Sequence, residues 1–240
     1  MYTNNFNFLK IHKFYDSEIN SLPYQMALQF DKRTYLNYYI SLLKTKHPLI
    51  FPFIANKDYN IVIIKISILL LSYSIYFGIN TFFFNTLTIH KIYEDQGNYN
   101  LKYQINKIIY SFFISHFICC IIKYISLSES NILKIKYQFT YEKANLMADK
   151  LRKYIFIKYI CFYVLSLAFI IFFWYYLSSF CAVFQNSQLF LFINTMISCG
   201  ISLVYPLFIN IFPAICRIIS LEKDRNLKCL YIISQIFQFL

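Results

Sequence analysis

Four long stretches without acidic residues limit what this chain can fold into more than any other feature. They cover residues 59–84, 104–127, 154–184 and 189–215. A hydrocarbon core about 30 Å thick needs about 20 apolar residues of helix to cross it. Backbone groups in lipid must form hydrogen bonds within their own segment, so continuous apolar runs of this length are helical. The sequence therefore predicts an all-α integral membrane protein with four transmembrane helices.

The composition fits a chain whose main solvent is lipid. Of the 240 residues, 58% are hydrophobic and 14% are charged, whereas a soluble domain carries about 25% charged residues. The aromatic content of 21% is also what AT-rich codons would produce, so we base no function on it.

Basic residues predict the orientation in the membrane. They gather before the first predicted helix, between the second and third, and after the fourth, while the first outer loop holds only Lys91 and Lys102. The positive-inside rule then places both termini on the cytoplasmic side. Lysines near the span ends are expected to extend to the headgroups; these are Lys65, Lys107, Lys123 and Lys158. The basic residues expected to anchor the chain to the membrane surface are Lys32, Arg33, Lys44, Lys46, Arg152, Lys153 and Arg217.

The net charge of +12 indicates a lipid surface as the partner and not a nucleic acid. The cations are spread over three segments beside membrane helices. Each gains about 1 kcal/mol from an anionic cytoplasmic leaflet.

Two segments outside the spans show helical amphipathicity. In residues 21–46 apolar positions recur at three-to-four spacing between Pro23 and Pro48, and residues 227–240 show a similar pattern. We interpret both as interfacial amphipathic helices; burial against a partner subunit is the alternative. The predicted organisation is a cytoplasmic segment at 1–58, a membrane domain at 59–217 and a cytoplasmic tail at 218–240.

The inner loop between the second and third spans is expected to be partly helical. Thr140 is a candidate helix cap, and the loop contains neither Gly nor Pro. A helix running from there through the third span would exceed about 60 Å at 1.5 Å per residue.

No residues are predicted to be catalytic or to bind a cofactor or metal. The chain has no GxSxG, HExxH or Gly-rich phosphate loop, which favours a non-enzymatic protein. His116 and Cys120 share a helix face, but two ligands do not make a metal site, and a helix-packing histidine is the main alternative. The seven cysteines are interpreted as small buried hydrophobes, with palmitoylation of Cys216 and Cys229 as the alternative.

The fourth span contains Gly200, Pro206 and Pro213. Each proline removes an intrahelical hydrogen bond, so we expect these three residues to form a hinge or to line a cavity. The alternative is that membrane helices simply tolerate proline.

Three sequence blocks carry a family resemblance: KTKHPLIF at 44–51, HKIYED at 90–95 and FFWYYLSSFCAVF at 172–184. With them, residues 22–238 resemble an uncharacterised multi-pass membrane family of ciliates, whose members are often longer. The His-Pro segment and the Asn-aromatic cluster NTFFFN at 80–85 are also weakly similar in spacing to the membrane region of polycystin-like proteins. That similarity implies a channel-associated role, although the large extracellular domain is missing.

Two functional hypotheses follow. The first is a non-enzymatic module of a channel or receptor-like assembly, with other membrane subunits or copies of itself as partners. The second is a structural subunit of an organelle membrane complex. The first favours the plasma membrane or an endomembrane, and the second the mitochondrial inner membrane.

The orientation is testable with engineered glycan acceptors. An acceptor placed within residues 86–100 is expected to be glycosylated in microsomes, whereas one beside Lys143 is expected to stay unmodified, because glycosylation marks the lumenal side. The reverse pattern on a gel would show that the topology is inverted.

Overall fold

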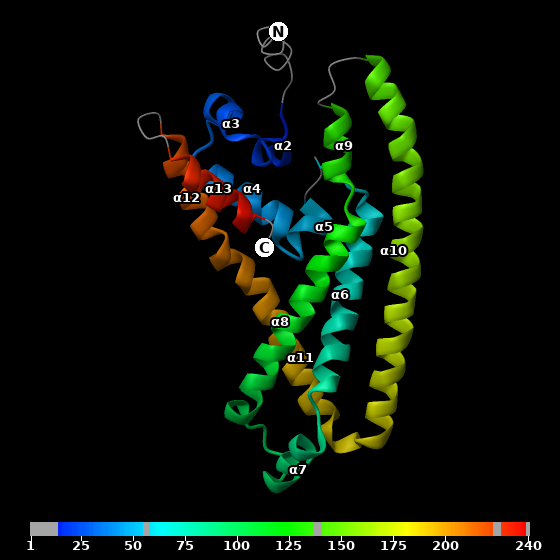
Figure 1. Ribbon diagram of the computed structural model, residues 1–240. Coiled ribbons are helices and arrows are strands. Elements are labelled where there is room, and N and C mark those ends of the chain that lie inside the picture. The colour runs from blue at the N-terminus through cyan, green and yellow to red at the C-terminus, as the bar shows by residue number, and fades with distance from the viewer. Residues whose placement is uncertain (1–13, 55–57, 137–140, 223–226, 239–240) are drawn as a thin grey trace. The chain divides into compact units, whose positions relative to one another are not determined.

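The computed structural model describes residues 14–54, 58–136, 141–222 and 227–238, and every regular element in these ranges is a helix (Figure 1). The helices that follow one another up to the third span are α2 Asp16–Asn20, α3 Tyr24–Phe30, α4 Tyr35–Lys46, α5 Ile50–Ile54, α6 Val62–Phe82, α7 Thr86–Glu94, α8 Leu101–Ser126 and α9 Glu129–Lys136. They are followed by α10 Tyr141–Val183, the short 3₁₀ turn η1 Gln185–Ser187, α11 Gln188–Ile209, α12 Ile211–Leu221 and α13 Lys228–Phe237.

The predicted membrane class and its four spans are confirmed. Four helical stretches are long and apolar enough to cross a bilayer: Val62–Phe82, Leu101–Leu133, Glu142–Val183 and Gln185–Leu221. Each contains most of one predicted charge-poor segment. The protein is therefore a multi-pass membrane protein.

The chain forms two compact units that alternate along the sequence. Unit 1 comprises residues 1–62, 127–156 and 206–240, and unit 2 comprises residues 63–126 and 157–205. The predicted N-terminal segment and C-terminal tail thus belong to the same unit, together with the basic loop between the second and third spans. This grouping is compatible with the predicted placement of both termini on one side of the membrane, which stays a prediction.

Side-chain contacts hold unit 1 together, both within its first segment and between its first and second segments. Tyr59 Oη donates to Glu18 Oε1 at 2.6 Å. Asn60 Oδ1 accepts the backbone N–H groups of Ser128 and Glu129 at 3.0 and 3.2 Å, where α9 begins. The Asn60 side chain therefore caps α9 from a distant part of the chain.

The predicted helix over residues 21–46 is two helices. Pro23 precedes α3, and α4 ends at Lys46, before the predicted stop at Pro48. The break between them falls where Asp31 accepts from the Arg33 side chain and Thr34 Oγ1 accepts from Asn37 N–H at the start of α4. Polar side chains that bond locally to the backbone favour such interruptions.

The third span is one uninterrupted helix. α10 contains 43 residues, or about 64 Å at 1.5 Å per residue. The expectation of a helix that continues from the inner loop through the span is confirmed. The candidate cap Thr140 lies outside the described residues.

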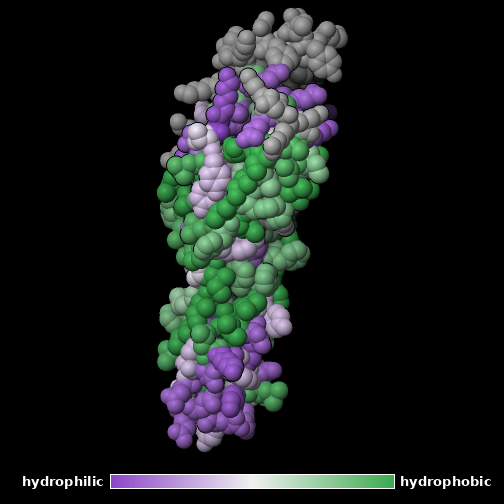
Figure 2. Space-filling view, turned by 90° about the vertical axis from the view of Figure 1, so that its left-hand side faces the viewer, coloured by the Kyte–Doolittle hydropathy of each residue, from purple (hydrophilic) through white to green (hydrophobic). Residues whose placement is uncertain are grey.

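In unit 2, α6 and α10 pack closely at a glycine. Gly78 of α6 has no side chain, and the Phe173 ring of α10 occupies that space, because a Cβ on Gly78 would lie 2.0 Å from Phe173 Cδ1. Phe173 is buried and stacks on Phe169 at 5.8 Å between ring centroids. On the face shown in Figure 2, hydrophobic side chains cover the middle of unit 2, and hydrophilic ones gather at its α7 end.

Replacing Gly78 by alanine is expected to destabilise the membrane bundle by about 1–3 kcal/mol, because the added methyl displaces a buried ring. The measurement is the thermal unfolding midpoint in detergent, followed by circular dichroism. Gly200→Ala is the matched control: nothing lies within 4 Å of its Cβ position, so its midpoint should not fall. Equal midpoints for wild type and Gly78→Ala would contradict the close packing.

Candidate functional site

The main candidate site is a column of polar side chains buried between α6, α8 and α11 of unit 2. Each helix contributes residues four or seven positions apart, which is one or two turns and places them on one face. The members of this polar column are Ser72, Tyr76 and Asn80 on α6, Gln104, Ser111 and Ser115 on α8, and Asn194, Ser198 and Ser202 on α11. All are buried except Ser72, which is partly buried.

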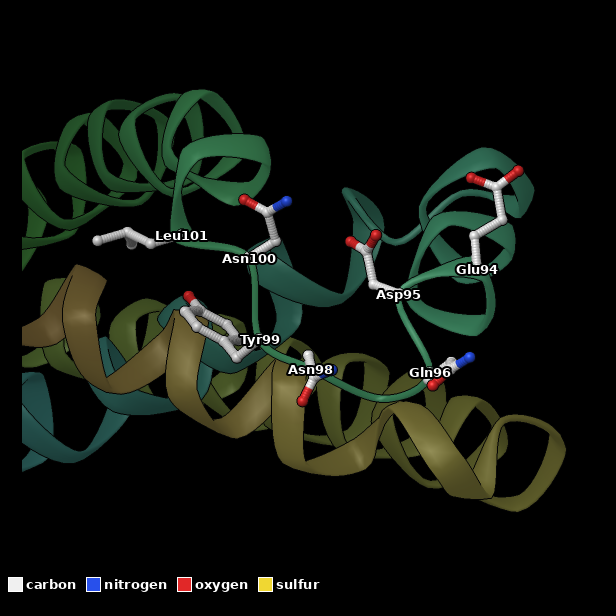
Figure 3. A pocket seen from close by; sticks show the side chains of 7 residues that line it. All are labelled: Glu94, Asp95, Gln96, Asn98, Tyr99, Asn100 and Leu101. Atoms are coloured by element: carbon white, nitrogen blue, oxygen red, sulfur yellow. The ribbon is translucent and has the colours of Figure 1, made fainter.

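At one end, called here the outer end after the predicted orientation, the column reaches the loop between α7 and α8. Tyr99 Oη donates to Asn194 Oδ1 at 2.7 Å, and Asn194 Nδ2 donates to Gln104 Oε1 at 3.2 Å. Tyr99 also lines an open pocket formed by the residues shown in Figure 3. The carboxylates of Glu94 and Asp95 lie on the α7 side of this loop, and Tyr99 lies near the start of α8. The column is thus joined by hydrogen bonds to the pocket.

In the middle of the column, Ser198 touches all three helices. Asn80 Nδ2 donates to Ser198 Oγ at 3.4 Å, and Ser198 Oγ also lies 3.5 Å from the carbonyl oxygen of Ile108 on α8. Its closest acceptor is the carbonyl of Asn194 on its own helix, at 2.9 Å. Ser198 is therefore the point at which the three helices share polar contacts.

Further along, the column consists mainly of hydroxyl groups. The Tyr76 hydroxyl lies beside Ser202, and the Cys119 thiol lies beside Ser72. The Ser111 and Ser115 side chains are fully buried, and their hydroxyls have no hydrogen-bond partner within the described part of the chain. Buried hydroxyls in an apolar medium are costly unless they find a partner.

Lysines flank the column on α8. Near its outer end, Lys107 Nζ donates to Thr88 Oγ1 and lies 4.0 Å from the centroid of the Tyr103 ring. Lys123 follows Cys119 by one helical turn and is partly buried. Lys65, which we expected to extend to the headgroups, is instead buried at 1% exposure. The snorkelling interpretation is therefore wrong for Lys65.

The motif HKIYED at residues 90–95 forms its own ion pairs. Lys91 Nζ lies 3.2 Å from Glu94 Oε2 and 3.3 Å from Asp95 Oδ1, and His90 Nδ1 lies 3.3 Å from Glu94 Oε1. The neighbouring carboxylates raise the pKa of Lys91, chiefly through its hydrogen bond with Glu94. Gly97 follows with a positive φ of 78°, which suits a turn.

His116 packs against aromatic rings. Its ring centroid lies 5.6 Å from that of Phe112 and 5.2 Å from that of Tyr205. Among the residues that the structure describes, no three His, Cys, Asp or Glu side chains meet where they could hold a metal ion. Of the two candidate palmitoylation sites, Cys216 is buried and Cys229 is exposed.

The predicted hinge residues surround a break in the fourth span. Helix α11 continues through Gly200 and Pro206 to Ile209, and α12 starts at Ile211. Pro213 cannot donate to the Ile209 carbonyl, so the helix is interrupted four residues before this proline. At the break, Asn210 Nδ2 donates to the Pro206 carbonyl at 2.7 Å. Whether the break acts as a hinge stays a prediction.

A second buried polar cluster holds unit 1 together around Arg217. Arg217 Nε donates to Asp31 Oδ2 at 2.9 Å, and its Nη1 and Nη2 donate to the carbonyls of Asn20 and Ile19 at 3.1 and 2.6 Å. The guanidinium also lies 4.9 and 4.8 Å from the ring centroids of Tyr38 and Tyr231. This buried Arg217 cluster joins α12 to the segment containing α2 to α4 and to α13.

The same cluster sets the charge state of Asp31. Burial raises the pKa of this carboxyl, but the hydrogen bonds and positive charges of Arg33 and Arg217 outweigh that effect, so the pKa lies below its ordinary value. Burial raises the pKa of the Tyr38 and Tyr231 hydroxyls. Asp31 is therefore ionised at neutral pH and faces two guanidinium groups.

The expected membrane anchors fall into three groups. Three of them are exposed: Lys32, Arg152 and Lys153. Two are partly buried, Lys44 and Lys46, and the Lys46 ammonium donates a hydrogen bond to the Phe237 carbonyl at 2.8 Å. Arg33 pairs with Asp31 at 2.8 Å.

Arg217 is fully buried, so its assignment as a surface anchor is wrong. From the sequence we expected every cation near a span end to face solvent. Nothing in the pattern indicated that Asp31 pairs with a residue 186 positions later.

Some of the column was visible in the sequence and some was missed. The Ser111, Ser115 and Cys119 stripe and the polar residues of α11 stand out in an apolar background. The matching positions on α6, at residues 72, 76 and 80, were overlooked, although they repeat at the same four-residue spacing.

No family model matches this chain, and no curated protein or solved structure matches it.

Unit 1 is expected to lose stability in acid. Because its pKa is lowered on folding, Asp31 contributes stability above its unfolded pKa of about 3.9, and the contribution disappears as the pH falls through the folded value. Asp31→Asn should remove this pH dependence and destabilise the unit by about 3–5 kcal/mol at neutral pH, since Arg217 stays buried without its partner.

The measurement is hydrogen exchange of α3 and α13 amides in detergent at a series of pH values. Asp16→Asn is the control, because Asp16 is an exposed carboxyl in the same unit. An Asp31→Asn protein with wild-type protection at neutral pH would contradict the role of the cluster.

Proposed function

We propose that this protein is a non-enzymatic membrane module of a channel or receptor-like assembly, and that the polar column of unit 2 is its functional element. The observation that carries the proposal is the alignment of buried polar side chains on α6, α8 and α11. Polar residues inside membrane bundles either bind helices together or mark routes for ions and polar solutes. The Ser111 and Ser115 hydroxyls, which have no partner among the described residues, and the link to an open pocket favour a route.

Pro206, which lies inside α11 four residues before the break at Asn210, supplies a candidate moving part. The column residues of α11 end at Ser202, and Pro206 follows one turn later. Because Pro206 has no N–H, the Ser202 carbonyl lacks its usual donor four residues on, which weakens the helix there. Bending at this point would alter how the α11 residues face α6 and α8.

Unit 1 would rest on the anionic cytoplasmic leaflet. Its exposed cations Lys32, Arg152 and Lys153 accompany exposed apolar side chains such as Leu36 and Phe53. This combination suits an interface of headgroups and acyl chains.

The membrane part of α10 leaves many apolar side chains uncovered, among them Val164, Leu167 and Ile171. They would contact lipid, other subunits or a second copy of the chain. The same face favours the second candidate function, a structural subunit of an organelle membrane complex, since such a subunit needs a broad surface for neighbours.

Purified protein in planar bilayers is expected to give discrete conductance. Pro206→Ala restores a helix hydrogen bond in a segment where proline costs about 3 kcal/mol, so the open probability should change. Pro48→Ala, outside the spans, is the matched control and should behave as wild type. Silent bilayers at high protein load would refute the channel proposal and leave the structural subunit as the better hypothesis.

A further inference from the structure

The chemistry of the column distinguishes the kinds of solute it could pass. Its side chains are hydroxyls and carboxamides, which are neutral. The four charge-poor segments contain no Asp or Glu, and the charged residues of α6, α8 and α11 are lysines, among them the buried Lys65. Lys107 stands near the outer end and Lys123 near the other end of α8. A neutral lining between two cations has a positive potential along its length.

We propose that the polar column conducts small monovalent anions such as chloride. This inference rests on the proposed channel function and deepens it. Hydroxyl and amide groups can donate hydrogen bonds to an anion, and lysine side chains are among the groups that select anions in pores. A cation path would need acidic groups or converging carbonyls, and the column provides no acidic group.

The serine hydroxyls supply contacts for an anion in the middle of the route. Ser111 and Ser115 lie one turn apart on α8, both fully buried, and neither hydroxyl has a partner in the described ranges. Each can donate one hydrogen bond without breaking an existing contact. An anion or its accompanying water would receive these bonds in a conformation whose helices are further apart.

The outer pocket does not oppose anion entry by its charge. Its carboxylates, Glu94 and Asp95, are within 3.3 Å of the Lys91 ammonium. Their charges are partly compensated before an anion reaches Tyr99. Beyond Tyr99 the first partly buried charged group along α8 is Lys107, whose ammonium contacts Thr88 and the Tyr103 ring.

The test is the reversal potential of the full-length protein in planar bilayers with a steep potassium chloride gradient. We expect a value close to the equilibrium potential of chloride. A value close to that of potassium would overturn the anion assignment but leave the channel proposal intact. Absence of conductance would overturn both, so the two failures are distinguishable.

Single-residue variants then test whether the ion passes along the polar column. Lys107→Gln and Lys123→Gln should each lower the chloride-to-potassium permeability ratio about fivefold, which is the effect of one unit charge at about 4 Å in water. Lys228→Gln, an exposed lysine of unit 1, is the control. An unchanged ratio in both column variants would overturn the assignment.

A double variant tests whether the serine hydroxyls of α8 line the path, with little change in side-chain volume. The double variant Ser111→Ala and Ser115→Ala removes only two hydroxyls, so the bundle should fold. We expect severalfold lower chloride conductance with an unchanged reversal potential. Wild-type conductance in a monodisperse double variant would show that the ion does not pass between α6, α8 and α11.

Discussion

A polar group inside hydrocarbon is costly unless it finds a partner within the protein, and this constraint accounts for the helices and for most contacts of the column. Backbone groups satisfy it by forming hydrogen bonds within their own helix, so a long apolar segment in lipid is helical. Side chains satisfy it between helices: Asn194 bonds to Tyr99 and Gln104, and Asn80 bonds to Ser198. The same requirement that fixes how three spans pack also concentrates polar chemistry along one line.

Unit 1 meets a related requirement with charges. Arg217 is fully buried, and its donors are taken up by one carboxylate and two backbone carbonyls, with aromatic rings beside the guanidinium plane. A buried arginine is costly unless its charge is paired and its nitrogens donate hydrogen bonds, and each of the three Arg217 nitrogens donates one. Residues that are far apart in the sequence must therefore meet accurately, which makes unit 1 a specific structure and not a loose collection of surface helices.

The sequence predicted the spans because charge-poor length is a local property that does not depend on what packs nearby. It also predicted the end of α4 before Pro48 and the long α10, again from local signals. It did not predict the burial of Arg217 or Lys65, because burial depends on which distant segment faces a side chain. Of the column, α8 and α11 showed polar positions in the sequence, but their alignment with α6 depends on helix rotation, which the pattern alone leaves open.

The route of the chain through unit 1 has a consequence for its synthesis. Asp31 is made early, yet Arg217 and Tyr231 follow about 200 residues later. At roughly 5–20 residues per second, the N-terminal helices wait about 10–40 s on the ribosome while four spans are inserted. Until Arg217 is made, the Asp31 carboxylate, which is buried in the folded unit, has only Arg33 of its two arginine partners. Nascent chains stalled before the last helix should therefore depend on chaperones or on the membrane surface to protect this unfinished unit.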